Sequence, residues 1–305
     1  MLRAIVLGAA AGGGFPQWNS NAPGCSRARA GDPLAKRRTQ ASLAISADGE
    51  RWVVLNASPD LRAQIEATPA LQPRGAIRSS PIAAVVLTGG DVDAVAGLLH
   101  LRERQPFALY ATRPVLGVLA ANPIFNVLSE LVDRRELPLA ALALADAAGV
   151  PLGLSARAFA VPGKVPLYLE TPGQVPEHRV GPETIGLALS AGGPSLGFVP
   201  GCAAITDDVH ACLAEAAVVL FDGTLWADDE MIRAGLGPKT GQRMGHVSVS
   251  GPAGVMARLG DLGARRKILI HINNSNPVLL EDSAEHAAVV AAGWGVAEDG
   301  MEIAL

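Results

Sequence analysis

Acidic and histidine side chains follow three apolar runs of the sequence, each at a point where a β-strand is expected to end. Asp91 and Asp93 come after one run and two glycines. Asp222 follows a second run and His271 a third, and the stretch 273–277 then adds asparagine and serine side chains that can hold an imidazole or a substrate. Open α/β sheets bind ligands at the carboxyl ends of their strands. Carboxylates and imidazoles gathered there can exchange protons or bind a metal ion, so the sequence predicts a shared site.

The same residues also have structural interpretations. Asp91 can cap a following helix, and Asp93 can stabilise the dipole of that helix. His246 precedes a segment in which Ser250 is expected to cap a helix that Pro252 opens, so packing explains this histidine as well as chemistry does. Three strand ends that each carry an ionisable side chain nevertheless favour the shared site.

The first loop of the sequence has some features of a nucleotide-binding loop. Gly8, Gly12 and Gly14 follow an apolar run with a spacing that lets backbone amides approach a pyrophosphate. The stretch 15–23 contains two prolines and is not expected to form the helix whose N-terminus would bind the phosphates. The sequence therefore argues against a nucleotide site, and no cofactor-binding residues are assigned.

Short apolar segments bounded by Gly, Pro, Asn or Asp predict the elements that position these side chains. The expected strands cover residues 2–7, 42–46, 52–55, 83–88, 108–111, 156–161, 185–190, 195–199, 217–221, 267–272 and 300–304. Helical spacing covers residues 92–104, 114–131, 207–215, 252–259 and 283–292. Hairpin turns are expected at Asp48-Gly49 and around 191–193. This order predicts an α/β fold in which helices cover sheets in layers.

The composition limits the class of protein. Apolar residues make up 49% of the chain and charged residues 18%, which indicates a globular protein. The net charge of −4 gives no long-range attraction for nucleic acid, and no apolar run approaches the ~20 residues that span a bilayer. Three scattered cysteines do not form a disulfide framework. We therefore expect a cytoplasmic protein without nucleic-acid or membrane partners. We also expect one domain over residues 1–305, with 137–151 as the candidate for a half-way joint.

Five short stretches together resemble the pyrroloquinoline quinone (PQQ) synthesis protein B family, a branch of the metallo-β-lactamase fold. They are Gly12-Gly13-Gly14-Phe15-Pro16-Gln17-Trp18-Asn19, Asn56-Ala57-Ser58-Pro59-Asp60, Phe221-Asp222-Gly223-Thr224, Met244-Gly245-His246 and His271-Ile272-Asn273-Asn274. They occur in the right order and span most of the chain. The resemblance implies an αββα four-layer sandwich of the metallo-β-lactamase type, with the active site along one edge of its two central sheets.

The chain departs from the family at a metal-binding stretch. The family usually holds a structural zinc through three cysteines, and here those positions are Ser20, Ala22 and Cys25. One thiolate cannot form the closed tetrahedral site that a structural zinc needs. We therefore expect this zinc to be absent.

A second departure concerns the catalytic metal. The wider fold binds its metals through His-x-His-x-Asp-His after a strand, a motif that falls on residues 89–94 here. Asp93 keeps the aspartate of this motif, whereas Ala94 stands where the family has its last histidine. The resemblance implies that Asp93 and His271 bind iron, with Asp91 helping in place of the missing histidine.

The function implied by the resemblance is a step of PQQ biosynthesis. An iron- and oxygen-dependent reaction would hydroxylate the tyrosine ring of a small or dipeptide precursor made from a glutamate–tyrosine unit. Asp222 and His246 would orient this precursor or exchange protons with it. The incomplete ligand set leaves open whether the chain is an enzyme, and a carrier of PQQ or its precursor is the first alternative. A metal-dependent hydrolase is the second, disfavoured because no carboxylate stands at residues 200–202. The sequence is compatible with a homodimer as well as with a monomer.

Overall fold

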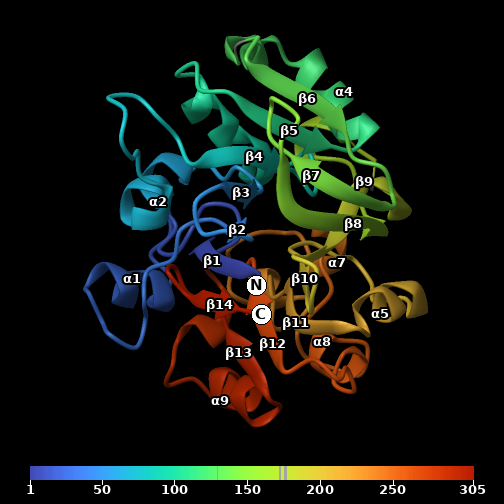
Figure 1. Cartoon of the computed structure of the whole chain (residues 1–305). Helices are drawn as coiled ribbons and strands as arrows, with labels where there is room; N and C mark the ends of the chain where they lie inside the picture. Colours follow the sequence, from blue (N-terminus) through green and yellow to red (C-terminus); the bar gives the residue numbers. More distant parts are fainter. Residues whose placement is uncertain (129, 172, 175–176) are drawn as a thin grey trace.

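The computed structural model describes residues 1–128, 130–171, 173–174 and 177–305, and two seven-stranded β-sheets form its centre. Figure 1 shows the two ends of the chain close together, beside β1 and β14. The Leu2 N–H donates to the Leu305 carbonyl oxygen at 3.0 Å. The first and last strands of the chain are therefore neighbours in one sheet.

The first sheet has the strand order β14-β1-β2-β3-β4-β5-β6. Its strands are β1 (Arg3–Gly8), β2 (Ser42–Ser46), β3 (Trp52–Leu55), β4 (Ile82–Val86), β5 (Phe107–Ala111), β6 (Val132–Glu136) and β14 (Glu302–Ala304). β2 and β3 form the antiparallel hairpin predicted at Asp48-Gly49. Gly49 has a φ of 77°, a left-handed conformation that glycine adopts without a steric penalty. From β3 to β6 the strands run parallel.

The second sheet has the strand order β13-β12-β11-β10-β9-β8-β7. Its strands are β7 (Ala141–Ala145), β8 (Pro151–Gly163), β9 (Arg179–Ser190), β10 (Ser195–Val199), β11 (Ala216–Asp222), β12 (Arg266–Ile270) and β13 (Trp294–Val296). β9 and β10 are antiparallel and form the second predicted hairpin. From β10 to β13 the strands run parallel, so β11 and β12 deliver the residues that follow them to the same edge.

The helices are short. The α-helices are α1 (Pro23–Arg29), α2 (Leu61–Ala67), α3 (Val92–Val95), α4 (Arg113–Ala121), α5 (Asp207–Leu213), α6 (Glu230–Arg233), α7 (Gly241–Met244), α8 (Val255–Arg258) and α9 (Ala284–Ala291). Short 3₁₀ helices cover Pro69–Leu71, Ala96–Leu101, Pro123–Val127, Leu167–Leu169 and Pro277–Leu279. Among the described helices, none is both long and apolar enough to cross a bilayer.

Three apolar clusters give the molecule its layers. The first fills the space between the sheets with side chains from both of them, such as Leu43 and Phe198. The second packs α2, α3 and α4 against the outer face of the first sheet. The third packs α5, α8 and α9 against the outer face of the second sheet. Strands buried on both faces need apolar side chains on both, which is why they appear in the sequence as apolar runs. The predicted αββα sandwich is confirmed.

Two predicted helices are shorter than their spacing indicated. α3 ends at Val95 and continues as a 3₁₀ turn, because the Gly97 N–H bonds to the Ala57 carbonyl oxygen of a neighbouring loop. α4 ends at Ala121, two residues before Pro123, as expected where a proline removes a backbone donor. The predicted span 114–131 also includes residue 129, which lies outside the described residues.

Other expectations differ from the structure in detail. The helix predicted over 252–259 begins at Val255 after Gly254, and the Ser250 hydroxyl donates to the Trp226 carbonyl oxygen instead of capping it. Three strands were not predicted, namely β6, β7 and β13. The stretch 137–151, expected as a joint, contains β7 and carries the chain from the edge of the first sheet to the edge of the second.

Candidate functional site

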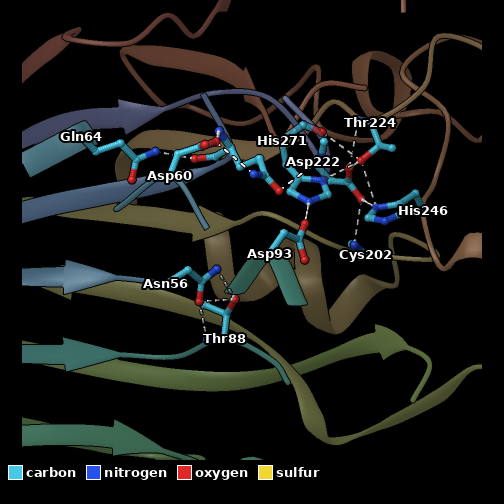
Figure 2. Close-up of polar contacts among 12 residues, drawn as sticks. Asn56, Asp60, Gln64, Thr88, Asp93, Cys202, Asp222, Thr224, His246 and His271 are labelled. Carbon is cyan, nitrogen blue, oxygen red and sulfur yellow. Dashed lines mark hydrogen bonds and ion pairs between the residues drawn. The ribbon is translucent and has the colours of Figure 1, made fainter. Parts of the chain in front are cut away.

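A cavity of about 510 Å³ opens at the edge where β4, β11 and β12 end. Asp91, Asp93, Thr224, His246 and His271 all line it, although more than a hundred residues separate the first pair from the rest. Figure 2 shows His271 between Asp93 on one side and the Asp222–Thr224 pair on the other. The structure thus brings together the strand-end residues that the sequence singled out.

The backbone at His271 is unusual. This residue has a φ of 57°, a left-handed conformation that residues other than glycine rarely adopt. Two hydrogen bonds fix the next residue to the loop after β1: the Ala11 N–H donates to the Ile272 carbonyl oxygen at 2.9 Å, and the Ile272 N–H donates to the Ala9 carbonyl oxygen at 3.0 Å. A conformation of this kind costs on the order of 1–3 kcal/mol and persists where its surroundings enforce it, most often at functional sites.

The imidazole of His271 is bonded on both sides. Its Nε2 lies 2.7 Å from Asp93 Oδ2, and its Nδ1 lies 2.9 Å from Thr224 Oγ1. Burial lowers the pKa of His271, but the hydrogen bond and charge of Asp93 outweigh burial and raise the pKa above its ordinary value. Burial raises the pKa of Asp93, but the bond to His271 outweighs it and the pKa falls. Asp93 and His271 therefore favour a carboxylate–imidazolium pair.

The second histidine is oriented by a buried carboxylate at the end of β11. Asp222 is fully buried, and its Oδ2 lies 2.7 Å from His246 Nδ1. Because a carboxylate only accepts hydrogen bonds, His246 Nδ1 carries the hydrogen, and the neutral ring keeps its lone pair on Nε2. The rings of His246 and His271 are stacked with their centroids 5.2 Å apart. His246 thus has the tautomer that suits a metal ligand or a general base.

Asp222 also organises the backbone around it. Its Oδ2 accepts the Cys202 N–H at 2.9 Å, and its Oδ1 accepts the Thr224 N–H at 3.0 Å and the Thr224 hydroxyl at 2.6 Å. Thr224 then stands between the two histidines, 3.1 Å from His246 Nδ1. Thr224 is therefore a site residue, although its place in the motif Phe221-Asp222-Gly223-Thr224 did not predict a role for it. Its position two residues after Asp222 was the signal.

Asp91 lines the same cavity but plays a different part. It occupies the N-cap position of α3, yet its side chain makes no capping hydrogen bond. Burial and the neighbouring charge of Asp93 raise the pKa of Asp91, and the positive charge of Lys164 and a backbone N–H from Leu167 lower it by smaller amounts. Ala94, the position of the missing histidine, is 6% exposed and also lines the cavity.

Two polar networks that were not predicted hold the loops of the site. Asn56, at a φ of 59°, donates to the Thr88 hydroxyl at 2.9 Å and accepts the Thr88 N–H at 2.8 Å, which fixes the loop that leads to Asp93 (Figure 2). Asp60 Oδ2 accepts both the N–H and the side-chain amide of Gln40, each at 2.9 Å. Asn56 and Asp60 belong to one motif of the sequence, which was the available signal.

The asparagine-rich stretch after His271 fixes loops and does not contact the imidazole. Asn276 donates to the Gly223 carbonyl oxygen at 2.9 Å. Asn274 Oδ1 lies 3.5 Å from the buried Cys25 thiol, within the stretch where the family has its cysteines. In that same stretch, Ser20 Oγ accepts the Ala22 N–H at 3.2 Å.

Two sets of residues have donor atoms that suit a divalent metal. Asp222, His246 and His271 each bring one donor atom within 4.8 Å of the others. The Thr224 hydroxyl already contacts all three of these residues. Asp93 and His271 face the cavity instead and share a hydrogen bond that a metal ion could replace. Imidazole nitrogen and carboxylate oxygen are ordinary ligands of zinc.

Comparisons with known proteins show the family of the chain. Residues 51–272 match the model of the beta-lactamase superfamily domain. The chain is 60% identical to coenzyme PQQ synthesis protein B of Gluconacetobacter diazotrophicus, with 99% of both chains covered. It is 57% identical to the protein of that name from Gluconobacter oxydans, over 100% of this chain and 99% of the relative.

Two solved structures are also similar to this chain. Zinc-bound PqqB from Methylobacterium extorquens superposes with a TM-score of 0.94 at 50% identity, covering 99% of this chain and 100% of that one. A diphosphatase of the PhnP family superposes with a TM-score of 0.71 at 19% identity, over 100% of this chain and 98% of that one, and shares the fold.

The zinc-bound structure corrects the cofactor prediction. We expected iron in the site and the absence of the structural zinc, whereas a relative of 50% identity was solved with zinc, so the comparison points to zinc and gives iron no support. The expected absence of zinc was wrong because it rested on the count of thiolates at Ser20, Ala22 and Cys25, and the choice of iron rested on the resemblance alone. Zinc also binds through imidazole and carboxylate groups, and the cavity supplies both.

Proposed function

The chain belongs to the coenzyme PQQ synthesis protein B family within the beta-lactamase superfamily, and we propose from this premise that it acts in PQQ biosynthesis. The substrate would be a small or dipeptide precursor built from a glutamate–tyrosine unit, and the reaction would be hydroxylation of the tyrosine ring. One oxygen atom of O2 would enter the ring and the other would leave as water, with an external two-electron reductant such as ascorbate supplying the electrons. The observation that carries the proposal is the convergence of Asp93, His246 and His271 on one cavity. A cavity of about 510 Å³ lies in the range of small-molecule sites.

The residues that line the cavity would have different roles in this reaction. Asp93 and His271 would hold the metal, with Asp91 as the further carboxylate on the cavity wall. Bound there, zinc would act as a Lewis acid that polarises an oxygen atom of the substrate. His246 would take up the phenolic proton of the substrate at Nε2, since Asp222 holds the hydrogen on Nδ1.

The test is an assay for the oxygenated product. Wild-type protein, Asp93→Ala and His271→Ala are incubated in air with a glutamate–tyrosine dipeptide and ascorbate, and mass spectrometry detects the gain of one oxygen atom. His210→Ala is the matched control, because His210 pairs with the surface residue Asp261. Product and bound metal should both be lost in the first two variants and kept in the control. Undiminished product and metal content in Asp93→Ala and His271→Ala would refute these roles.

A second candidate, a carrier of PQQ or its precursor, is favoured by two observations. Ala94 removes one ligand of the family's metal set, and zinc has no accessible redox state with which to supply the electrons that hydroxylation needs. A carrier would bind the dipeptide without converting it. If Ala94→His gains strong metal binding and activity where the parent has none, the carrier role is supported; product formed by the parent excludes it.

A further inference from the structure

A cluster of charges stands beside the cavity, next to the segment that carries His246. It consists of Lys164, Glu170, Lys239 and Arg243. Among the described residues that line the cavity, Lys164 is the one lysine or arginine. It directly follows β8, so a long strand of the second sheet fixes its backbone.

One carboxylate binds all three cations of this cluster. Glu170 Oε1 lies 3.0 Å from Lys164 Nζ, and Glu170 Oε2 lies 2.8 Å from an Arg243 nitrogen and 4.0 Å from Lys239 Nζ. The hydrogen bond from Arg243 and the contact with Lys164 hold the pKa of Glu170 at about 2, so this carboxylate stays ionised. The cluster itself therefore carries three positive charges against one negative charge.

The ammonium group of Lys164 is fixed and still has a donor to spare. Its side chain is 10% exposed and packs with its carbon atoms against Gly245, the residue before His246. Within the described part of the chain, Nζ bonds to Glu170 Oε1 and donates to the Val165 carbonyl oxygen at 3.2 Å. An ammonium group has three N–H donors, so one remains for a ligand in the cavity.

Lys164 is thus the lysine or arginine that the described lining offers to an anionic ligand, and its charge lies close enough to Asp91 to lower the pKa of that carboxyl. A ligand that carries a carboxylate is attracted by the ammonium group of Lys164. We propose that Lys164 binds the carboxylate of an amino-acid substrate and that Glu170 and Arg243 position Lys164 for this contact. This inference rests on the proposed function and adds the orientation of the substrate: carboxylate at Lys164, ring toward His246.

The experiment compares L-tyrosine with tyramine, which lacks only the carboxylate. Isothermal titration calorimetry measures the affinity of both ligands for the wild-type protein and for Lys164→Met, Lys164→Arg and Lys239→Met. A charge-assisted hydrogen bond corresponds to about a tenfold to hundredfold change in affinity. Wild type should therefore prefer L-tyrosine by such a factor. Lys164→Met should lose this preference with tyramine binding unchanged, and Lys164→Arg should restore part of it. Lys239→Met, which touches Glu170 from outside the lining of the cavity, is the matched control and should behave as wild type.

The outcomes separate the two proposals. Equal affinity of wild type for both ligands, or an unchanged preference in Lys164→Met, overturns the role of Lys164 and leaves the proposed function standing. Failure of both ligands to bind wild type overturns the assignment of the cavity to a tyrosine unit, and the role of Lys164 with it. If Lys164→Met and Lys239→Met lose the preference for L-tyrosine equally, the direct contact between Lys164 and the carboxylate is also refuted. The preference would then depend on the net charge of the cluster.

Discussion

Asp222 is expected to be the residue of the site whose loss most destabilises the fold. Its two oxygens accept the Cys202 N–H, the Thr224 N–H and the Thr224 hydroxyl, and its side chain is fully buried. Asp222→Ala leaves the Cys202 and Thr224 N–H groups without an acceptor, at about 1–3 kcal/mol each when water does not replace it, whereas the Thr224 hydroxyl can still donate to the His271 carbonyl oxygen at 2.9 Å. The expected loss in the free energy of unfolding is therefore at least about 2 kcal/mol, a substantial part of the ~5–15 kcal/mol that stabilises a typical protein.

Asp222→Asn distinguishes the hydrogen bonds from the volume of the side chain. The amide keeps one accepting oxygen, but its NH2 group must face either the Cys202 N–H or the donors of Thr224, so a backbone N–H loses its acceptor in either orientation. We expect a loss of about 1–3 kcal/mol, less than for Asp222→Ala. Urea unfolding followed by circular dichroism, with a chelator present, measures both losses. Asp261→Ala, at an exposed aspartate, is the control. If Asp222→Ala lies within about 0.5 kcal/mol of wild type, the hydrogen-bond argument is wrong.

Three further predictions concern residues that support the site. Burial raises the pKa of Asp299 to about 6, so the native state binds this proton more tightly than the unfolded chain. The free energy of unfolding should then fall by up to roughly 3 kcal/mol between pH 4 and pH 7, and Asp299→Asn should lose this slope in urea titrations at the two pH values. Gly97→Ala should destabilise the fold by several kcal/mol, on the order expected for overpacking or more, because the added Cβ would lie 2.1 Å from the Ser58 carbonyl oxygen. A thermal melt that matches wild type would contradict this. Asn56→Ala should cost about 2 kcal/mol in urea unfolding, since the Thr88 N–H loses its acceptor and alanine disfavours the left-handed φ. Asn56→Gly, which relieves only the backbone, should cost less; an equal cost would refute the share given to φ.

The sequence predicted the strand ends of the site better than the contacts between them. Asp93, Asp222 and His271 could be placed together because parallel strands deliver the residues after them to one edge of a sheet. Thr224 and Lys164 could not be placed in the site from the sequence. Threonine and lysine are common on protein surfaces, and the roles of these two residues depend on partners distant in the chain. Glu170, for example, is bound by Arg243, which lies 73 residues away.

The errors in the elements have similar causes. β6 reads Val-Asp-Arg-Arg-Glu, and a charged edge strand carries no apolar run from which to predict it. The end of α3 depends on the Gly97–Ala57 hydrogen bond, which is a tertiary contact. The metal was misassigned because residue types near a site do not fix which ion a relative binds.

The hydrogen bonds between Ala9, Ala11 and Ile272 have a consequence for how the protein matures. They join the eleventh residue to the 272nd, and β14 then pairs with β1. During translation the amino-terminal strands leave the ribosome long before their partners exist, so the cavity cannot close until almost the whole chain has been synthesised. Contacts over such long sequence separations slow folding, because loop closure is unfavourable before the contacts form. A nascent chain stalled before His271 would therefore hold the first sheet with an unpaired β1 edge, which is the stage at which this protein most needs protection from aggregation.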